Sequence, residues 1–218
     1  MNGKNFNKIY KIQDKILNLV FSLHNSFYLT GGTAIHRFYF PYRFSNDLDF
    51  FTSANEIYYD ELKIILQKLN DENIEIKIIA QVKDFARIMI DNGLQVDFVN
   101  DRTYREGKSN IINGYKIDNI ENIFANKICA TIDRDEEKDF FDLFVIAKNF
   151  SFNWNHIWSI CNKKQIVEKS IFIQRIKTFP LIWLEKIILI NPFTIEKEDI
   201  LYFIEDCIYG RQNSLFKY

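Results

Sequence analysis

The segment from residue 27 to residue 51 limits the possible folds of this chain more than any other stretch. It contains an apolar run that ends in two glycines, a short amphipathic segment, and two aspartates one residue apart inside an apolar strand. Because side chains alternate between the faces of a strand, Asp47 and Asp49 are predicted to point to the same side. Neighbouring carboxylates repel each other and are costly among hydrophobic side chains. A hard divalent cation such as magnesium, which takes oxygen ligands, would offset that cost.

Gly31 and Gly32 come directly before residues 33–40, which are predicted to form a helix that Pro41 stops. Glycine lets the backbone turn sharply and approach a ligand closely. Free N–H groups at the start of a helix attract phosphate, so Gly31, Gly32 and Thr33 are candidates for binding the triphosphate of a nucleotide. A glycine pair alone is usually a simple turn, and an isolated Asp-x-Asp usually lies in a surface loop or edge strand. Together, in this order, they favour nucleotidyl transfer.

Two polar residues between the glycines and the aspartates are further candidates for phosphate contacts. Ser45 is expected to donate a hydrogen bond to a phosphate, and Arg43 to neutralise one. Arg43 fits equally well as a surface residue in a salt bridge. His36, on the predicted helix, is interpreted as a packing residue.

Asp97 is the candidate for a third carboxylate. It is a lone acid in the apolar strand predicted over residues 94–99. Polymerase-type transfer uses such an acid beside one metal ion and the attacking hydroxyl. A half-buried acid on a strand needs a partner, which a metal shared with the aspartates of a neighbouring strand would supply. The alternative is that Asp97 faces solvent on an edge strand.

The hydrophobic pattern predicts an α/β (α+β) fold with a mixed sheet flanked by helices, followed by an α-helical part. Strands are predicted over 27–29, 47–51, 74–80, 85–90 and 94–99, with a hairpin turn at 91–93, and helices over 5–26 and 56–70. The turn-rich residues 107–114 mark the expected boundary between a catalytic core over 1–110 and a helical domain over 111–218 that completes the nucleotide cleft. Helices are predicted there over 118–133, with Asp118 as N-cap, and over 136–149, 154–163, 165–176, 180–190 and 196–208.

Composition excludes some classes of protein. The chain of 218 residues is 47% hydrophobic and 16% aromatic, which favours a well-buried globular protein over a disordered one. Its net charge of −1 gives no bulk attraction for nucleic acid, so a nucleic-acid partner would need a local basic patch. Three widely spaced cysteines show neither zinc spacing nor a disulfide framework. With no apolar leader and no long apolar run, we expect a soluble, cytoplasmic chain without a membrane partner.

A second group of candidates lies in residues 121–143. Lys127 lies beside the apolar stripe of a predicted helix, where a lysine is more often a surface residue that extends its ammonium group to solvent. Asp139 and Asp142 are three residues apart, so they share a helical face. As metal ligands they would be redundant with the strand acids. We expect them instead to orient Lys127, Arg134 or Lys138.

These motifs resemble one known family. The strings Leu-Thr-Gly-Gly-Thr-Ala and Arg-Phe-Ser-Asn-Asp-Leu-Asp-Phe-Phe, with residues 121–146, resemble the AbiEii/AbiGii-type toxin family of nucleotidyltransferases, within the DNA polymerase β-like superfamily. The resemblance implies the toxin of a toxin–antitoxin or abortive-infection pair, held in check by a separately encoded antitoxin. Its substrates would be a nucleoside triphosphate (NTP) and an RNA acceptor such as tRNA. The 14 residues between Gly32 and Asp47 are toward the long end of the superfamily pattern, which leaves the placement of Arg43 and Ser45 open.

The resemblance also implies roles for single residues. Asp47, Asp49 and Asp97 would be the catalytic acids and would bind Mg²⁺ or Mn²⁺, while Lys127 would contact the nucleotide phosphates. Asp142 would shape the nucleotide site.

Two alternatives remain open at this point. One is a small-molecule nucleotidyltransferase of the antibiotic-modifying kind, and the other is a non-catalytic nucleotide-binding regulatory module. The candidates for docking an RNA acceptor are Lys163, Lys164, Arg175 and Lys177. The alternative is that these residues simply form solvent-exposed faces of the predicted helices.

Overall fold

The computed structural model describes residues 3–91 and 93–217, and they form two compact units. The first unit contains the described residues up to Ala34, Ser45–Arg102 and Ser109–Asp118. The second contains Ile35–Phe44, Thr103–Lys108 and the described residues from Asn119 onward. The chain therefore passes between the units several times. A catalytic core over 1–110 and a helical domain over 111–218 that completes the nucleotide cleft stay predictions.

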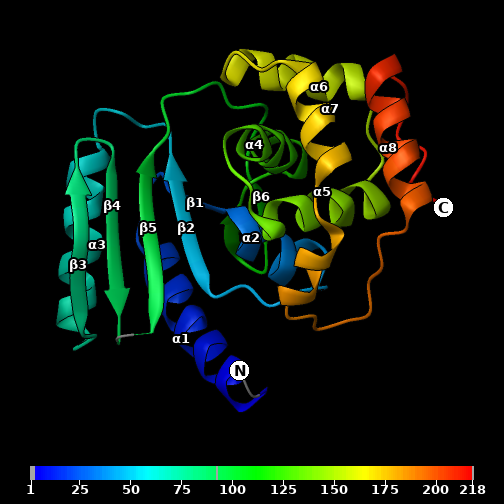
Figure 1. The fold of residues 1–218 in the computed structure, drawn as a ribbon. Coiled ribbons are helices and arrows are strands. Elements are labelled where there is room, and N and C mark those ends of the chain that lie inside the picture. Colours follow the sequence, from blue (N-terminus) through cyan, green and yellow to red (C-terminus); the bar gives the residue numbers. More distant parts are fainter. Residues whose placement is uncertain (1–2, 92, 218) are drawn as a thin grey trace. The chain divides into compact units, whose positions relative to one another are not determined.

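The first unit is built on a mixed seven-stranded sheet (Figure 1), which confirms the predicted fold class. The strand order is β3-β4-β5-β2-β1-β7-β6, with β2 parallel to β5, β1 parallel to β7 and the other neighbours antiparallel. The strands are β1 (Tyr28–Thr30), β2 (Asp47–Thr52), β3 (Ile76–Val82), β4 (Phe85–Ile90), β5 (Leu94–Asn100), β6 (Asn110–Ile112) and β7 (Tyr115–Ile117).

One face of this sheet is apolar and covered by two helices, α1 (Gly3–Ser22) and α3 (Tyr58–Asp71) (Figure 1). Phe50 and Phe98 stack on this face, and the Tyr58 hydroxyl of α3 donates to the Phe98 carbonyl oxygen at 3.1 Å. Along β2 every second residue, beginning with Leu48, is buried, as period-2 alternation requires. The opposite face is left for the polar residues of the same strands.

Sequence patterns missed the β6–β7 hairpin and placed the start of the helix after the glycine pair wrongly. Each of these two strands has only three residues, too few for a visible alternation. The glycine pair lies inside a short helix, α2 (Gly31–Ala34), that continues as a π-helical turn over Ile35–Tyr39. The helix therefore starts at the glycines rather than after them.

The second unit is helical, with α4 (Ile120–Asp133) packed against α5 (Glu137–Asn149), α6 (Trp154–Lys164) and α7 (Lys169–Thr178). α8 (Lys197–Tyr209) packs on α6 and α7, and the predicted helix over 180–190 is a 3₁₀ turn over Leu181–Lys186. The N-cap of α4 is Asn119, whose side chain accepts the N–H of Asn122, and not Asp118 as predicted. Asp118 is instead held in the first unit, where its carboxylate accepts the Thr30 hydroxyl at 3.0 Å.

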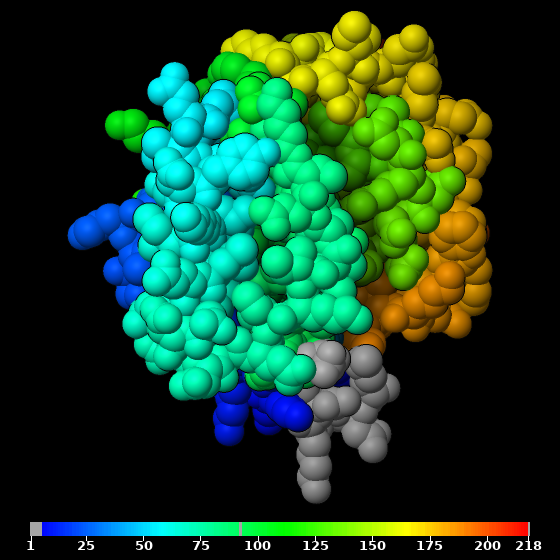
Figure 2. All heavy atoms as spheres, turned by 90° about the vertical axis from the view of Figure 1, so that its left-hand side faces the viewer, coloured from blue at the N-terminus to red at the C-terminus, as the bar shows by residue number. Residues whose placement is uncertain are grey.

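The outer surface of the first unit carries α3 and the edge strand β3 (Figure 2). A hollow of about 520 Å³ between them is lined by residues such as Tyr59, Leu66 and Gln81, and none of the candidate site residues lines it. Among the helices of the described chain, we find none whose length and apolar character would suit a bilayer crossing.

Candidate active site

Three aspartates share the face of the sheet that is opposite α1 and α3. β2 and β5 are parallel neighbours, and their register pairs Asp49 directly with Asp97. Asp47 lies two residues before Asp49, so it projects to the same side. We call Asp47, Asp49 and Asp97 the acidic face. The strand register places these three acids on adjacent strands, as predicted. Asp97 lies on an interior strand of the sheet rather than on an edge strand.

Gly31 is packed against Asp49 so closely that no other residue fits. Its φ is +70°, and a Cβ built on it would lie 2.3 Å from Oδ2 of Asp49. Real Cβ atoms essentially never approach another atom that closely. The glycine thus does two things: it allows the left-handed backbone, and it leaves the space that the Asp49 carboxylate occupies.

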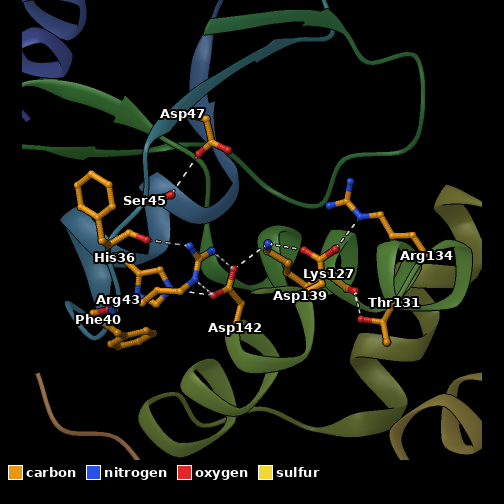
Figure 3. Close-up of polar contacts among 11 residues, drawn as sticks. His36, Phe40, Arg43, Ser45, Asp47, Lys127, Thr131, Arg134, Asp139 and Asp142 are labelled. Atoms are coloured by element: carbon orange, nitrogen blue, oxygen red, sulfur yellow. Dashed lines mark hydrogen bonds and ion pairs between the residues drawn. The ribbon is translucent and has the colours of Figure 1, made fainter. Parts of the chain in front are cut away.

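Asp47 is held by three polar side chains of the first unit. The Thr33 hydroxyl donates to the Asp47 carbonyl oxygen at 2.6 Å. The Ser45 hydroxyl donates to Oδ1 of Asp47 at 3.2 Å (Figure 3). Gln13 of α1 donates to the carbonyl oxygens of Ser45 and Asp47, at 3.0 and 3.3 Å. Gln13 is fully buried and was missed at the sequence level. Its signal was a polar residue on the apolar face of an amphipathic helix.

Arg87 of β4 faces Asp97 across the β4–β5 pair and was also missed. Its Nε donates to Oδ1 of Asp97 at 2.8 Å and its Nη2 to Oδ2 at 2.7 Å, a two-pronged ion pair. This hydrogen-bonded Asp97 carboxylate raises the pKa of Arg87, and the charges of Asp49 and Asp47 act in the same direction. Arg87 is therefore electrostatically coupled to all three acids of the acidic face.

The acidic face offers oxygen donors of the type that magnesium prefers. Within residues 3–91 and 93–217, no group of three or more His, Cys, Asp and Glu side chains is disposed to hold a metal ion. Asp47 and Asp49 are half-buried carboxylates, and Asp97 is paired with a guanidinium group. A metal ion fits this donor chemistry, and Arg87 is the cation with which it would compete for Asp97.

In the second unit, a buried cluster of charges surrounds Asp142 of α5 (Figure 3). Arg43 donates to both carboxylate oxygens at 2.7 Å, Lys127 Nζ lies 2.7 Å from Oδ2, and His36 Nε2 lies 2.8 Å from Oδ1. Asp142 is fully buried and Arg43 is 3% exposed. Burial works against the charged carboxylate, yet Arg43, Lys127 and His36 hold the pKa of Asp142 well below its usual value.

The cluster continues from Lys127 to the surface through Asp139. Lys127 Nζ donates to Oδ1 of Asp139 and Arg134 Nε donates to Oδ2, both at 2.7 Å. Burial opposes the charge on Lys127, but Asp142 and Asp139 outweigh it and raise the pKa of the ammonium group. The side chain of Arg134 is 60% exposed. Asp139 and Asp142 therefore lie where the sequence placed them, against Lys127 and Arg134.

The buried position of Arg43 contradicts the interpretation as a surface salt-bridge residue. Its Nε and Nη2 face Asp142, and its Nη1 donates to the Phe44 carbonyl oxygen at 3.1 Å. His36, expected to be a packing residue, is buried as expected but also contacts Asp142. Nucleotide contacts by Arg43, Lys127 and Asp142 stay predictions.

The model of the family described as nucleotidyl transferase AbiEii toxin, type IV toxin–antitoxin system, matches residues 18–170. The chain belongs to the AbiEii nucleotidyltransferase toxin family. The match includes both the acidic face and the Asp142 cluster, so AbiEii membership rests on the segments that carry the site.

One relative and two solved structures are similar to this chain. An uncharacterised protein from Aquifex aeolicus (strain VF5) is 31% identical over 166 residues, covering 74% of this chain and 75% of the relative. The crystal structure of JHP933 from Helicobacter pylori superposes with a TM-score of 0.65 at 21% identity, covering 96% of this chain and 93% of that one. A putative nucleotidyltransferase from H. pylori gives 0.57 at 24% identity, covering 82% and 77%. These two structures share the AbiEii chain's fold.

Proposed function

We propose that this chain transfers a nucleoside monophosphate from an NTP to an acceptor hydroxyl, in a reaction that needs Mg²⁺ or Mn²⁺. The observation that carries the proposal is the register that sets Asp49 beside Asp97, with Gly31 packed against Asp49. A structural sheet gains nothing from carboxylates on adjacent interior positions, because they repel each other. Membership of a nucleotidyltransferase family supports the same conclusion.

Asp47 and Asp49, with Asp97 as third ligand, are the residues that would hold the metal. When bound, the metal would neutralise charge that develops on the phosphoryl oxygens. Asp97 would also accept the proton of the acceptor hydroxyl on a carboxylate oxygen. Because the hydroxyls of Thr33 and Ser45 are engaged with Asp47, they orient that acid, and the backbone N–H groups of residues 31–33 are better candidates for the phosphates.

In our proposal the acceptor is RNA, with tRNA as the first candidate, and the protein acts in the cytoplasm as a toxin whose effects a separately encoded antitoxin counteracts. The toxin family supports this choice. In the second unit, Lys163 and Lys177 are exposed and Lys164 and Arg175 half-buried. Arg175 is paired with Asp135, and Lys163 and Lys164 donate to the hydroxyl and carbonyl oxygens of Tyr104, so Lys177 is the better candidate for RNA phosphates.

Replacing Asp49 with asparagine tests the proposal. The purified protein is incubated with each α-labelled NTP, Mg²⁺ and total bacterial RNA, and label in RNA is measured. We expect wild type to label a tRNA-sized band with one or more nucleotides, and Asp49→Asn to lose roughly a hundredfold or more because a metal-binding carboxylate is removed. Asp71→Asn, an exposed aspartate on α3, is the matched control and should keep wild-type labelling.

The other outcomes decide between the alternatives. Label that enters a small-molecule fraction instead of RNA would indicate a small-molecule acceptor. No label from any nucleotide in any acceptor pool would contradict the proposal and indicate a non-catalytic nucleotide-binding module. Equal labelling by wild type and Asp49→Asn would contradict the role of the acidic face.

A further inference from the structure

Arg87 completes a row of four side chains across four strands of the first unit. The strand registers pair Thr30 of β1 with Asp49 of β2, Asp49 with Asp97 of β5, and Asp97 with Arg87 of β4. All four project from the same face of the sheet, because residues paired directly across neighbouring strands share a face. The guanidinium group therefore stands at the end of the row of acids, within reach of the third carboxylate.

The two partners of the Arg87–Asp97 pair differ in burial. The Asp97 side chain is 9% exposed, whereas the Arg87 side chain is 39% exposed. A nearly buried carboxylate is costly without a cation or other partner. A half-exposed arginine loses little on leaving an ion pair, because water hydrates the released guanidinium group. The pair can therefore exchange its cation at low cost, provided that another cation takes the place of Arg87.

We propose that Arg87 is a positioning residue that holds the Asp97 carboxylate in the absence of metal and gives it up when a divalent cation binds the acidic face. The inference rests on the proposed metal site and adds to it an internal competitor. Arg87 keeps the Asp97 carboxylate aligned with Asp49 while no metal is present. It also lowers the affinity of the acidic face for free divalent ions, because one positive charge already lies against the third acid.

Affinity for Mn²⁺ without nucleotide, measured by electron paramagnetic resonance of the free ion, tests this inference. Arg87→Met removes the competing charge, so Mn²⁺ should bind roughly tenfold more tightly than to wild type. Arg87→Lys keeps the charge but loses the two-pronged geometry, and its affinity should lie between the two. The increase in Mn²⁺ affinity should vanish in the double variant Arg87→Met/Asp97→Asn, because it depends on the Asp97 carboxylate that Arg87 binds in wild type.

The chain contains a matched control for the loss of an arginine–aspartate pair. Arg102 donates to Asp84 through Nε at 3.0 Å and Nη2 at 2.8 Å, the same two-pronged geometry away from the acidic face. Arg102→Met should leave Mn²⁺ affinity unchanged. If Arg87 only stabilised the fold, Arg87→Met would lower the melting temperature as Arg102→Met does, with unchanged Mn²⁺ affinity, and the inference would be overturned.

Asp49→Asn separates the failure of this inference from the failure of the proposed function. Weaker Mn²⁺ binding by Asp49→Asn, with wild-type affinity in Arg87→Met, would overturn the role of Arg87 alone. Wild-type affinity in Asp49→Asn would overturn the metal site itself, and the proposed metal dependence with it.

Discussion

Replacing Asp142 with asparagine is expected to lower the free energy of unfolding by about 3 to 5 kcal/mol, because it leaves buried cations without their counter-charge. Asp142 is fully buried and contacts Arg43, Lys127 and His36 at 2.7 to 2.8 Å. An asparagine of the same shape retains some hydrogen bonds but not the negative charge. Urea unfolding followed by circular dichroism measures the loss.

Asp135→Asn is the control for this prediction. Asp135 pairs with Arg175 in the same unit, but 60% of its side chain is exposed. Because solvent screens such a pair, its loss should cost less than about 1 kcal/mol. If Asp135→Asn and Asp142→Asn lowered the free energy of unfolding by equally small amounts, the charged cluster around Asp142 would not be a main source of stability in this chain.

The difference in free energy of unfolding between wild type and Asp142→Asn should also depend on pH, which gives a second measurement. The pKa of Asp142 is well below the ordinary aspartate value of 3.8, because Arg43, Lys127 and His36 outweigh the effect of burial. A group whose pKa is lowered in the folded state contributes stability that is complete above the unfolded pKa and is lost as pH falls through the folded pKa. The difference in unfolding free energy between wild type and Asp142→Asn should shrink as pH falls below about pH 4. A difference that widens below about pH 4 would contradict the assignment.

Replacing Gly31 with alanine is expected to reduce nucleotidyl transfer by roughly a hundredfold, because catalysis is sensitive to displacements of about 1 Å. The new Cβ would lie 2.3 Å from Oδ2 of Asp49, so either the carboxylate or the backbone of α2 must move. Both shifts change the position of a proposed metal ligand. Label transfer from an α-labelled NTP measures the effect, with Mn²⁺ affinity as an independent check on the acidic face.

Gly114→Ala separates the clash from the backbone strain. Gly114 also has a left-handed φ, of +84°, but a Cβ there has no neighbour within 4 Å. Both substitutions force alanine into a conformation that costs about 1 to 2 kcal/mol. Gly114→Ala should therefore lose stability and keep full transfer activity. Similar activity losses in the two variants would mean that Gly31 matters only for its backbone conformation.

The sequence was most informative where local periodicity determines the direction in which side chains point. The alternation of residues 47–51 predicted that Asp47 and Asp49 share a face. The turn predicted at 91–93, whose residue 92 lies outside the described residues, indicated that the strand of Asp97 pairs with the strand over 85–90, as it does. The same hairpin pairs Arg87 with Asp97, so a count of residues from the turn could have found this arginine. The role of Gln13 is harder to predict, because its hydrogen-bond partners are backbone carbonyl oxygens, which no sequence pattern reveals.

Other features depend on contacts between distant segments. Asp118 and Asn119 are both good N-cap residues, and sequence alone favoured the first. Asp118 is instead bound to Thr30, which is 88 residues away, leaving the cap to Asn119. Arg43 and Asp142 are 99 residues apart, so their buried ion pair was equally invisible. The local sequence identifies residues that could cap a helix or form an ion pair, but tertiary contacts decide which of them do so.

The position of the bond that breaks in the NTP tests the central claim most directly. Matched reactions contain the same NTP labelled at either the α- or the γ-phosphorus, with Mg²⁺ and the acceptor RNA, and the label is followed into acceptor and free products. Nucleotidyl transfer predicts that the α-label joins the acceptor while the γ-label is released in pyrophosphate. Entry of the γ-label into the acceptor, or release of inorganic phosphate without labelled acceptor, would contradict the account.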